Sequence, residues 1–187
     1  MEEDVKFLLD ETREHMHKAL KHLEEELRHV RAGKASPEML EGIHVEYYGV
    51  PTALNQVAGI KVMDSRTLMI TPFERRIIGD IERAIFQGNI GVTPQNDGEN
   101  IRITMPIMTE ERRKELVKQS KNHGEHTKIA VRAARKDSME MVKAMQKDGL
   151  SEDLVKNTEQ DIQHLTDEHI AKVDKMLQLK EEEIMHI

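Results

Sequence analysis

Apolar residues recur every three or four positions along three long stretches of the chain, a spacing typical of one face of an α-helix. The stretches cover residues 4–30, residues 109–147 and the chain from Ser151 onwards. Because each is much longer than an ordinary globular helix, we predict three rods of a bundle or coiled coil. The positions expected to face its core are Val5, Leu9, Thr12, Met16, Ala19, Leu23, Leu27, Val30, Val117, Ser120, Gly124, Thr127, Val131, Ala134, Ser138, Met141, Met145, Leu154, Ile162, Leu165, Val173, Leu177 and Ile184.

The stretch from Thr109 to Lys147 is the longest predicted helix. It contains no proline and one glycine, Gly124, and it opens with a threonine N-cap followed by two glutamates that suit the positive end of the helix dipole. At 1.5 Å per residue it is expected to be roughly 58 Å long. Its core-facing residues are mostly small, which predicts close approach of a neighbouring helix. Gly124 is therefore interpreted as a close-packing position.

The hydrophobic period changes between residues 31 and 105. Residues 31–37, RAGKASP, break the first helix, and PEMLEG predicts a short helical piece. Short β-branched or aromatic runs separated by turn residues then predict strands in IHVEYYG, VAGIKV, TLMIT and IRITM. A helix is predicted over 74–87, and NIGVTPQNDGE reads as a loop. The predicted buried stripe of that helix is Ile77, Ile78, Ile81, Ile85 and Phe86.

These elements predict an α+β fold in which a small β/α/β domain interrupts a bundle. Residues 1–30 and 106–187 form a long three-helix bundle, antiparallel because its connections are short, and residues 31–105 are the insert. Two segments, 31–37 and 105–108, join the domains. Because few contacts cross such a junction, we expect it to act as a hinge. The predicted hinge residues are Arg31, Ala32, Gly33, Met105, Pro106 and Ile107.

Composition excludes several classes of protein. The chain of 187 residues has no cysteine, so disulfides and thiolate metal sites are excluded. Aromatic residues make up 3% and tryptophan is absent, so helices packed through aliphatic side chains are favoured over a large aromatic core. The N-terminus, MEEDVKFLLDE, resembles neither a signal nor a transit peptide, and no apolar run approaches membrane-spanning length. We therefore expect a soluble, intracellular protein.

Charge is distributed unevenly along the chain. The net charge is −7, yet residues 109–147 hold eleven Lys or Arg against six Asp or Glu, a net +5. At 3.6 residues per turn, eight basic residues project to one side of this helix. A solvated face and a polyanion-binding face both remain open, the second favoured by Arg132, Arg135 and Lys136, which are adjacent in mid-helix. The basic stripe consists of Lys114, Lys118, Lys121, Lys128, Arg132, Arg135, Lys136 and Lys143.

No catalytic constellation emerges from the remaining motifs. Residues 33–36, GKAS, resemble part of a phosphate-binding loop but lack its first glycine and the hydroxyl residue after the lysine. The histidine pairs His123/His126 and His164/His169 lack a third ligand in a zinc pattern, so surface histidines are expected. Paired carboxylates fall at helix ends. We therefore expect that the protein is not an enzyme and that it binds neither a cofactor nor a metal ion.

Several long motifs together resemble the bacterial-type ribosome recycling factor family over essentially the whole chain. They are RAGKASPEML, IHVEYYGVP, DSRTLMITPFE, NDGENIRITMP, MTEERRKEL, IAVRAARKDS, LSEDL, QHLTD and KEEEIM. The resemblance implies an L-shaped molecule that works with elongation factor G, and GTP hydrolysed by that factor, to split the post-termination ribosome into subunits. It further implies a cytoplasmic monomer that binds the large ribosomal subunit through its RNA.

The resemblance also assigns residues. The basic RNA contacts of the family fall on Arg31, Lys34, Arg132, Arg135 and Lys136, and the stripe adds Lys128 as a further RNA-binding candidate. Lys34 and Lys136 stand where many members have arginine, so they keep the charge and lose the bidentate fork. Ala133 stands where the family often has asparagine. From the residues alone, the alternative is a coiled-coil adaptor or chaperone that binds a protein partner.

Overall fold

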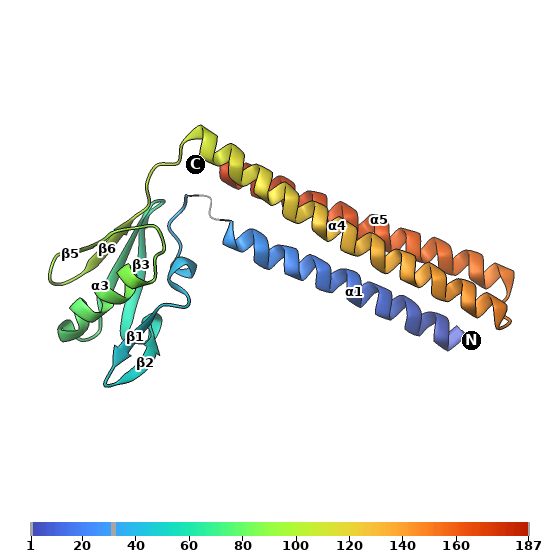
Figure 1. Cartoon of the computed structure of the whole chain (residues 1–187), viewed down its shortest axis with the longest axis horizontal. Coiled ribbons are helices and arrows are strands. Elements are labelled where there is room, and N and C mark those ends of the chain that lie inside the picture. Colours follow the sequence, from blue (N-terminus) through green and yellow to red (C-terminus); the bar gives the residue numbers. More distant parts are fainter. Residues whose placement is uncertain (1, 31–32, 187) are drawn as a thin grey trace. The chain divides into compact units, whose positions relative to one another are not determined.

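The computed structural model describes residues 2–30 and 33–186, which divide into two compact units (Figure 1). The first unit contains the helices on either side of the insert, residues 2–30 and 110–186, and the second contains residues 33–109. Each unit has its own hydrophobic core. We describe them separately as the bundle unit and the small unit.

The bundle unit consists of α1 (Glu2–His29), α4 (Glu110–Lys147) and α5 (Glu152–Met185). Gly149, at φ +103°, ends α4, and the amide of Leu150 donates to the carbonyl of Met145 at 3.0 Å, a bond typical of a Schellman turn. Ser151 then caps α5 by accepting from the amide of Leu154. This tight reversal makes α4 and α5 antiparallel, as Figure 1 shows.

Contacts between the helices fix the direction of α1. The hydroxyl of Thr12, near the start of α1, lies 2.6 Å from that of Ser138, near the end of α4. Glu26, near the end of α1, instead pairs with His123 of α4, its Oε2 lying 2.6 Å from Nδ1. α1 therefore runs antiparallel to α4 and parallel to α5. The three long predicted helices and the α+β character of the chain are confirmed.

The bundle core differs from the predicted seam at several positions. Leu8 and Leu20 are buried in α1, whereas Leu9 and Ala19 are only partly covered. In α4 the predicted Met141 is exposed. A strict three-four seam drifts by about 20° per heptad around a straight helix, so extra four-residue steps restore it. Buried positions missed by the pattern are Leu8, Leu20, Leu116, Val142, Val155, Thr158, Thr166 and His169.

His169 corrects the expectation that the paired histidines lie at the surface. Its side chain is only 3% exposed, and Nδ1 lies 2.6 Å from the carbonyl oxygen of Leu165. Position 169 falls one turn after Leu165 and one turn before Val173, both of which are buried. The ring therefore belongs to the core face of α5, and the local hydrogen bond satisfies one of its nitrogens.

Gly124 is a close-packing position, as predicted. A Cβ atom at this site would lie 2.3 Å from Cδ1 and 2.8 Å from Cδ2 of Leu177 on α5. Real Cβ atoms do not approach other atoms so closely, so any larger residue must displace Leu177. The absence of a side chain at 124 therefore lets α5 place a leucine directly against the α4 backbone.

We predict that Gly124→Ala changes the free energy of unfolding in opposite directions in two backgrounds. In the native chain, overpacking against Leu177 should outweigh the roughly 1 kcal/mol that alanine gains over glycine in a helix, for a net loss of about 1 kcal/mol. In the Leu177→Ala background the space is free, and the same change should stabilise by about 1 kcal/mol. Urea unfolding of the four proteins measures both effects. An equal gain in both backgrounds would contradict the close packing.

The small unit begins with a short 3₁₀ helix, Pro37–Leu40, capped by Ser36. β1 (His44–Tyr47) and β2 (Val50–Ala53) form a two-stranded antiparallel sheet, and α2 is Leu54–Val57. The second sheet has the order β3-β4-β6-β5 and is antiparallel throughout. Its strands are β3 (Ala58–Asp64), β4 (Thr67–Pro72), β5 (Pro94–Asn96) and β6 (Ile101–Thr104).

A 3₁₀ turn, Arg75–Ile77, leads into α3 (Ile78–Gln87), which packs against the sheets through Ile81 and Ile85 (Figure 1). These isoleucines meet Leu68, Ile70, Ile101 and Ile103 in a fully buried core. The predicted stripe is wrong at one position, because Phe86 is 69% exposed. Phe86 follows Ile85 by only one residue, or about 100° around the helix, so it turns away from the core.

Candidate nucleic-acid interface

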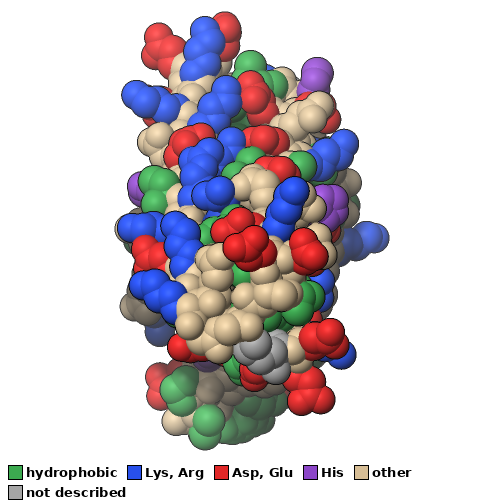
Figure 2. Space-filling model, turned by 90° about the vertical axis from the view of Figure 1, so that its right-hand side faces the viewer, with side chains coloured by type: hydrophobic (Ala, Val, Ile, Leu, Met, Phe, Trp, Pro, Cys, Tyr) green, Lys and Arg blue, Asp and Glu red, His purple; other side chains and the backbone are tan. Residues whose placement is uncertain are grey.

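All eight residues of the basic stripe lie on α4, within roughly 100° of arc around the helix. The buried residues of α4 centre about a third of a turn from the middle of the stripe, so most of the stripe faces solvent while its edge, at Lys128 and Arg135, borders the bundle core. Acidic and basic side chains nevertheless interleave over the surface seen in Figure 2. The question for each basic residue is therefore whether its charge is already neutralised by a neighbour.

Three lysines of the stripe are paired with carboxylates. Lys114 Nζ lies 3.1 Å from Glu110, one turn earlier in α4. Lys121 reaches Glu181 of α5 at 3.6 Å. Because both ion pairs are exposed to solvent, each contributes little to stability. Either lysine can therefore exchange its carboxylate partner for another anion.

Lys128 is held much more firmly. Its Nζ lies 2.6 Å from Asp174 of α5 and 3.7 Å from Glu125, and its side chain is only 16% exposed. The ion pair with Asp174 bridges α4 and α5. We interpret Lys128 as part of the helix–helix contact, although the sequence placed it among the RNA-binding candidates. Nothing in the sequence marks Asp174 as its partner, because the two residues are far apart along the chain.

Arg132 and Lys136 form the accessible part of the stripe. Both are exposed, one helical turn apart, and neither makes an ion pair with any residue in the described part of the chain. Their charges are therefore available to an external anion. Lys118 and Lys143, which lie on either side of this pair along α4, are also exposed and make no ion pair in the described part of the chain.

Arg135 is oriented by a residue that sequence reasoning missed. Its Nε donates to Oε1 of Gln163 on α5 at 2.7 Å, and Nε2 of Gln163 donates to Asp167 at 2.9 Å. Within the guanidinium, the hydrogen bond to Gln163 involves Nε. The two terminal amino groups therefore keep their donors for two oxygens of one acceptor. Arg135 is thus half-buried and fixed in direction, whereas Arg132 and Lys136 reach freely into solvent.

The other predicted contacts lie outside α4. Lys34 is exposed in the small unit, in the segment before the first 3₁₀ helix. There the amide of Ala35 donates to the carbonyl of Ser65, and Ser36 caps the helix, so the GKAS segment has a structural role. Arg31 and Ala32, predicted to contact RNA or form the hinge, lie outside the described residues.

Both segments that lead out of the small unit are fixed at the β3–β4 turn. The amide of Ala35 donates to Ser65, while the amide of Met105 donates to the carbonyl of Arg66 at 2.7 Å. Nε of Arg66 returns a bond to the carbonyl of Met105 at 3.0 Å. The Arg66 amide also donates to Asp64, which lowers the pKa of that carboxyl. Met105, a predicted hinge residue, is therefore a fixed end inside the core, whereas Ile107 is 73% exposed.

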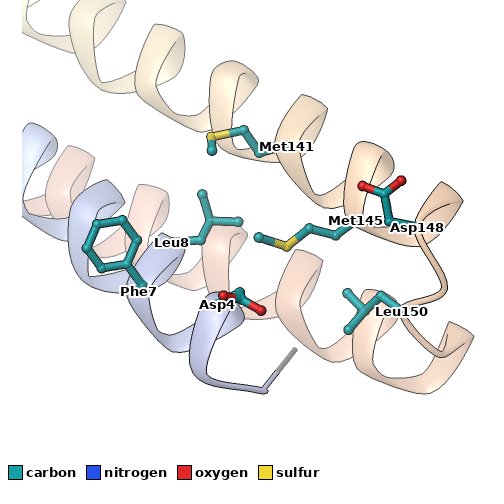
Figure 3. Close-up of a pocket in the computed structure, with 7 residues that line it drawn as sticks. All are labelled: Asp4, Phe7, Leu8, Met141, Met145, Asp148 and Leu150. Carbon is teal, nitrogen blue, oxygen red and sulfur yellow. The ribbon is translucent and has the colours of Figure 1, made fainter.

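An open pocket of about 340 Å³ lies at the end of the bundle where α1 begins and α4 turns into α5. Leu8 from α1 and the methionines Met141 and Met145 from α4 converge there (Figure 3). Among the described residues that line it, the titratable ones are Asp4 and Asp148. The described lining contains no nucleophile paired with a base.

In the described part of the chain, no cluster of three or more His, Cys, Asp or Glu residues has the arrangement of a metal site. Likewise, none of the described helices combines the length and the apolar character needed to cross a membrane. The exposed cations of α4 are a candidate binding feature of the bundle unit.

Comparison with known proteins decides the family. A family model described as "Ribosome recycling factor" matches residues 23–185. The chain belongs to the ribosome recycling factor family. The ribosome-recycling factor of Amoebophilus asiaticus is 49% identical over 185 residues, covering 99% of this chain and all of the relative. That of Bacillus licheniformis is 47% identical over 181 residues, covering 96% and 98% of the two chains.

Solved structures of ribosome recycling factors share the fold. A solution structure of the ribosome recycling factor matches with a TM-score of 0.79 at 32% identity and covers 98% of both chains. The T. thermophilus ribosome recycling factor, in a model with E. coli elongation factor G bound to the E. coli post-termination complex, matches with a TM-score of 0.63 at 40% identity and covers 96% and 98%. The resemblance, the fold class and the role in ribosome recycling predicted from the sequence are thereby confirmed.

Proposed function

We propose that this chain separates the post-termination ribosome into subunits together with elongation factor G and GTP. The observation that carries this proposal is the match of nearly half of all residues to ribosome-recycling factors along the full length of both chains. The related factor of T. thermophilus, placed with elongation factor G on a post-termination complex, supports the same two partners. In this proposal the chain acts in the cytoplasm as a monomer, and GTP is hydrolysed by the elongation factor.

The bundle unit is proposed to bind ribosomal RNA through α4. Arg132 and Lys136 supply exposed cations, and Arg135 supplies a guanidinium already oriented by Gln163. Arg31 and Lys34 are proposed to add contacts near the junction of the units. Phosphate oxygens suit this set, because Arg presents a fork of donors and Lys a mobile point charge. The bundle unit has one aromatic residue, Phe7 of α1, and α4 itself has none, which favours recognition of the RNA backbone over its bases.

Bending is proposed to occur just outside the two fixed ends of the small unit. The bonds from Ala35 and Met105 to the β3–β4 turn hold both connections against the small unit. The hinge is therefore proposed to lie on the bundle side of these anchors, at Gly33 and Lys34 and at Pro106 to Met108, next to Arg31 and Ala32, which lie outside the described residues. When elongation factor G engages the small unit, the bundle stays on the RNA and the small unit moves.

The test is a splitting assay on post-termination ribosomes, followed by light scattering or sucrose gradients. With elongation factor G and GTP the chain should convert them into subunits, and omission of either should abolish the reaction. The chain alone should sediment with large subunits and be released as salt is raised. Sedimentation that ignores salt, with no splitting, would favour a coiled-coil adaptor. GTP hydrolysis by the chain alone would contradict its non-enzymatic role.

A further inference from the structure

The aromatic residues of this chain are few and mostly exposed. There are two tyrosines and three phenylalanines, and Phe7, Tyr48, Phe73 and Phe86 are each more than 60% exposed. Aromatic side chains usually contribute to a core or an interface. In the small unit the core is made of aliphatic residues, so its exposed rings do not serve to fill the core. Among them, Tyr48 is the one that the surrounding structure holds in place.

Tyr48 occupies a position that normally disfavours a large side chain. It and Gly49 form the two-residue turn between β1 and β2, with Tyr47 paired to Val50. Both turn residues have positive φ, 50° for Tyr48 and 78° for Gly49, as in a type I′ turn. Asn or Asp is the preferred residue at such a site, and a bulky residue there stores strain. The ring is also 71% exposed, so it contributes little to the core in return.

Contacts among four neighbouring side chains hold the Tyr48 ring in place. The Arg76 guanidinium lies over it, 4.3 Å from the ring centroid. Arg76 Nε donates to Oε2 of Glu74 at 2.6 Å, and Tyr47 donates its hydroxyl proton to Oε1 of the same carboxylate. The Tyr47 ring meets Tyr48 edge-on with centroids 4.5 Å apart. The Tyr47 hydroxyl and Arg76 lower the pKa of Glu74, and Glu74 raises the pKa of Arg76, so both remain charged.

We propose that this cluster, Tyr47, Tyr48, Glu74 and Arg76, is a docking surface for a protein partner of the small unit. Tyrosine and arginine are enriched among the residues that dominate protein–protein binding energy. A ring and guanidinium already locked in place lose little freedom on binding. Val50, which follows the turn in β2, is also 60% exposed and extends the apolar surface of the hairpin.

Charge favours a protein over a nucleic acid as that partner. Residues 33–109 hold seven Lys or Arg against nine Asp or Glu, a net −2. The one arginine of the cluster is already neutralised by Glu74. Phosphate backbones are bound by uncompensated cations, which this surface lacks. Given the proposed function, on which this step rests, the protein partner is the elongation factor.

The test compares Tyr48→Asn with the native chain in the splitting assay as elongation factor G is varied. Asn-Gly is the preferred pair for this turn, so the variant should keep its Tm or gain a little while losing the docking ring. We expect the factor concentration for half-maximal splitting to rise about tenfold, as for loss of one dominant interface residue. Sedimentation with large subunits should not change. Phe86→Asn removes an equally exposed ring of the same unit and should leave both readouts unchanged.

The outcomes separate the two proposals. If the native chain does not split ribosomes, the proposed function fails whatever the variants do. If the native chain splits and Tyr48→Asn matches it, only the docking surface is wrong. Weaker sedimentation of Tyr48→Asn without the factor would instead indicate an RNA contact and overturn the protein assignment. Arg76→Lys, which keeps the charge and loses the planar stack, should give a smaller rise in the same direction.

Discussion

Reversing the charges of Arg132 and Lys136 together should lower the affinity for large ribosomal subunits by about 100-fold or more at low salt. Each change removes an attraction to phosphate and adds a repulsion. Both residues are exposed and make no ion pair within the described chain, so the bundle should stay folded. Sedimentation with large subunits across a salt series should also show a slope smaller by about one unit per lost contact.

A matched variant separates the site from net charge. Arg132→Glu with Lys136→Glu changes the net charge by −4, and Lys156→Glu with Lys175→Glu does the same on α5, at two exposed lysines. Only the α4 pair should lose affinity strongly. If both pairs weaken binding equally, the contact is a general attraction and the stripe has no special role. Thermal unfolding of both variants checks that the helices remain intact.

The long helices could be predicted because each buries one face over many turns. Repetition made the pattern in 4–30 and 109–147 clear even where single positions were misplaced, as with Leu8 and Leu9. The short elements of the small unit carried no such repetition. β2 contains Pro51 and has no buried residue, and β5 is three residues long inside a loop-like sequence. Their strand character comes from pairing with β1 and β6, which a local pattern does not contain.

For the single side chains of the candidate site, prediction from a local sequence pattern was limited in the same way. Helical periodicity was enough to place eight cations on one side of α4. It could not separate Lys128, which is neutralised by Asp174 across the bundle, from Arg132, which is not. Nor could it find Gln163, which directs Arg135. These distinctions depend on which residues of α5 lie opposite α4, and that register is set by the packing of the whole bundle.

Cross-linking the two connections between the units should slow ribosome splitting by at least about tenfold and leave ribosome binding intact. The natural chain has no cysteine, so Lys34→Cys with Ile107→Cys offers two unique thiols for a short bis-maleimide. Both positions are exposed. Lys34 comes just before the anchor Ala35, Ile107 comes two residues after the anchor Met105, and both anchors bond to neighbouring residues of one turn. A link between them fixes the connections further outward and removes rotatable residues from each.

The same double variant before cross-linking is the reference, because both samples then lack the Lys34 charge. Each single-cysteine variant treated with the reagent controls for modification of one connection alone. If the small unit must rotate while the bundle stays on the RNA, the linked protein should still sediment with large subunits and compete with the native chain for them. It should thereby inhibit splitting by the native chain. Splitting at the reference rate by fully linked protein would mean that rotation about these two connections is not part of the mechanism.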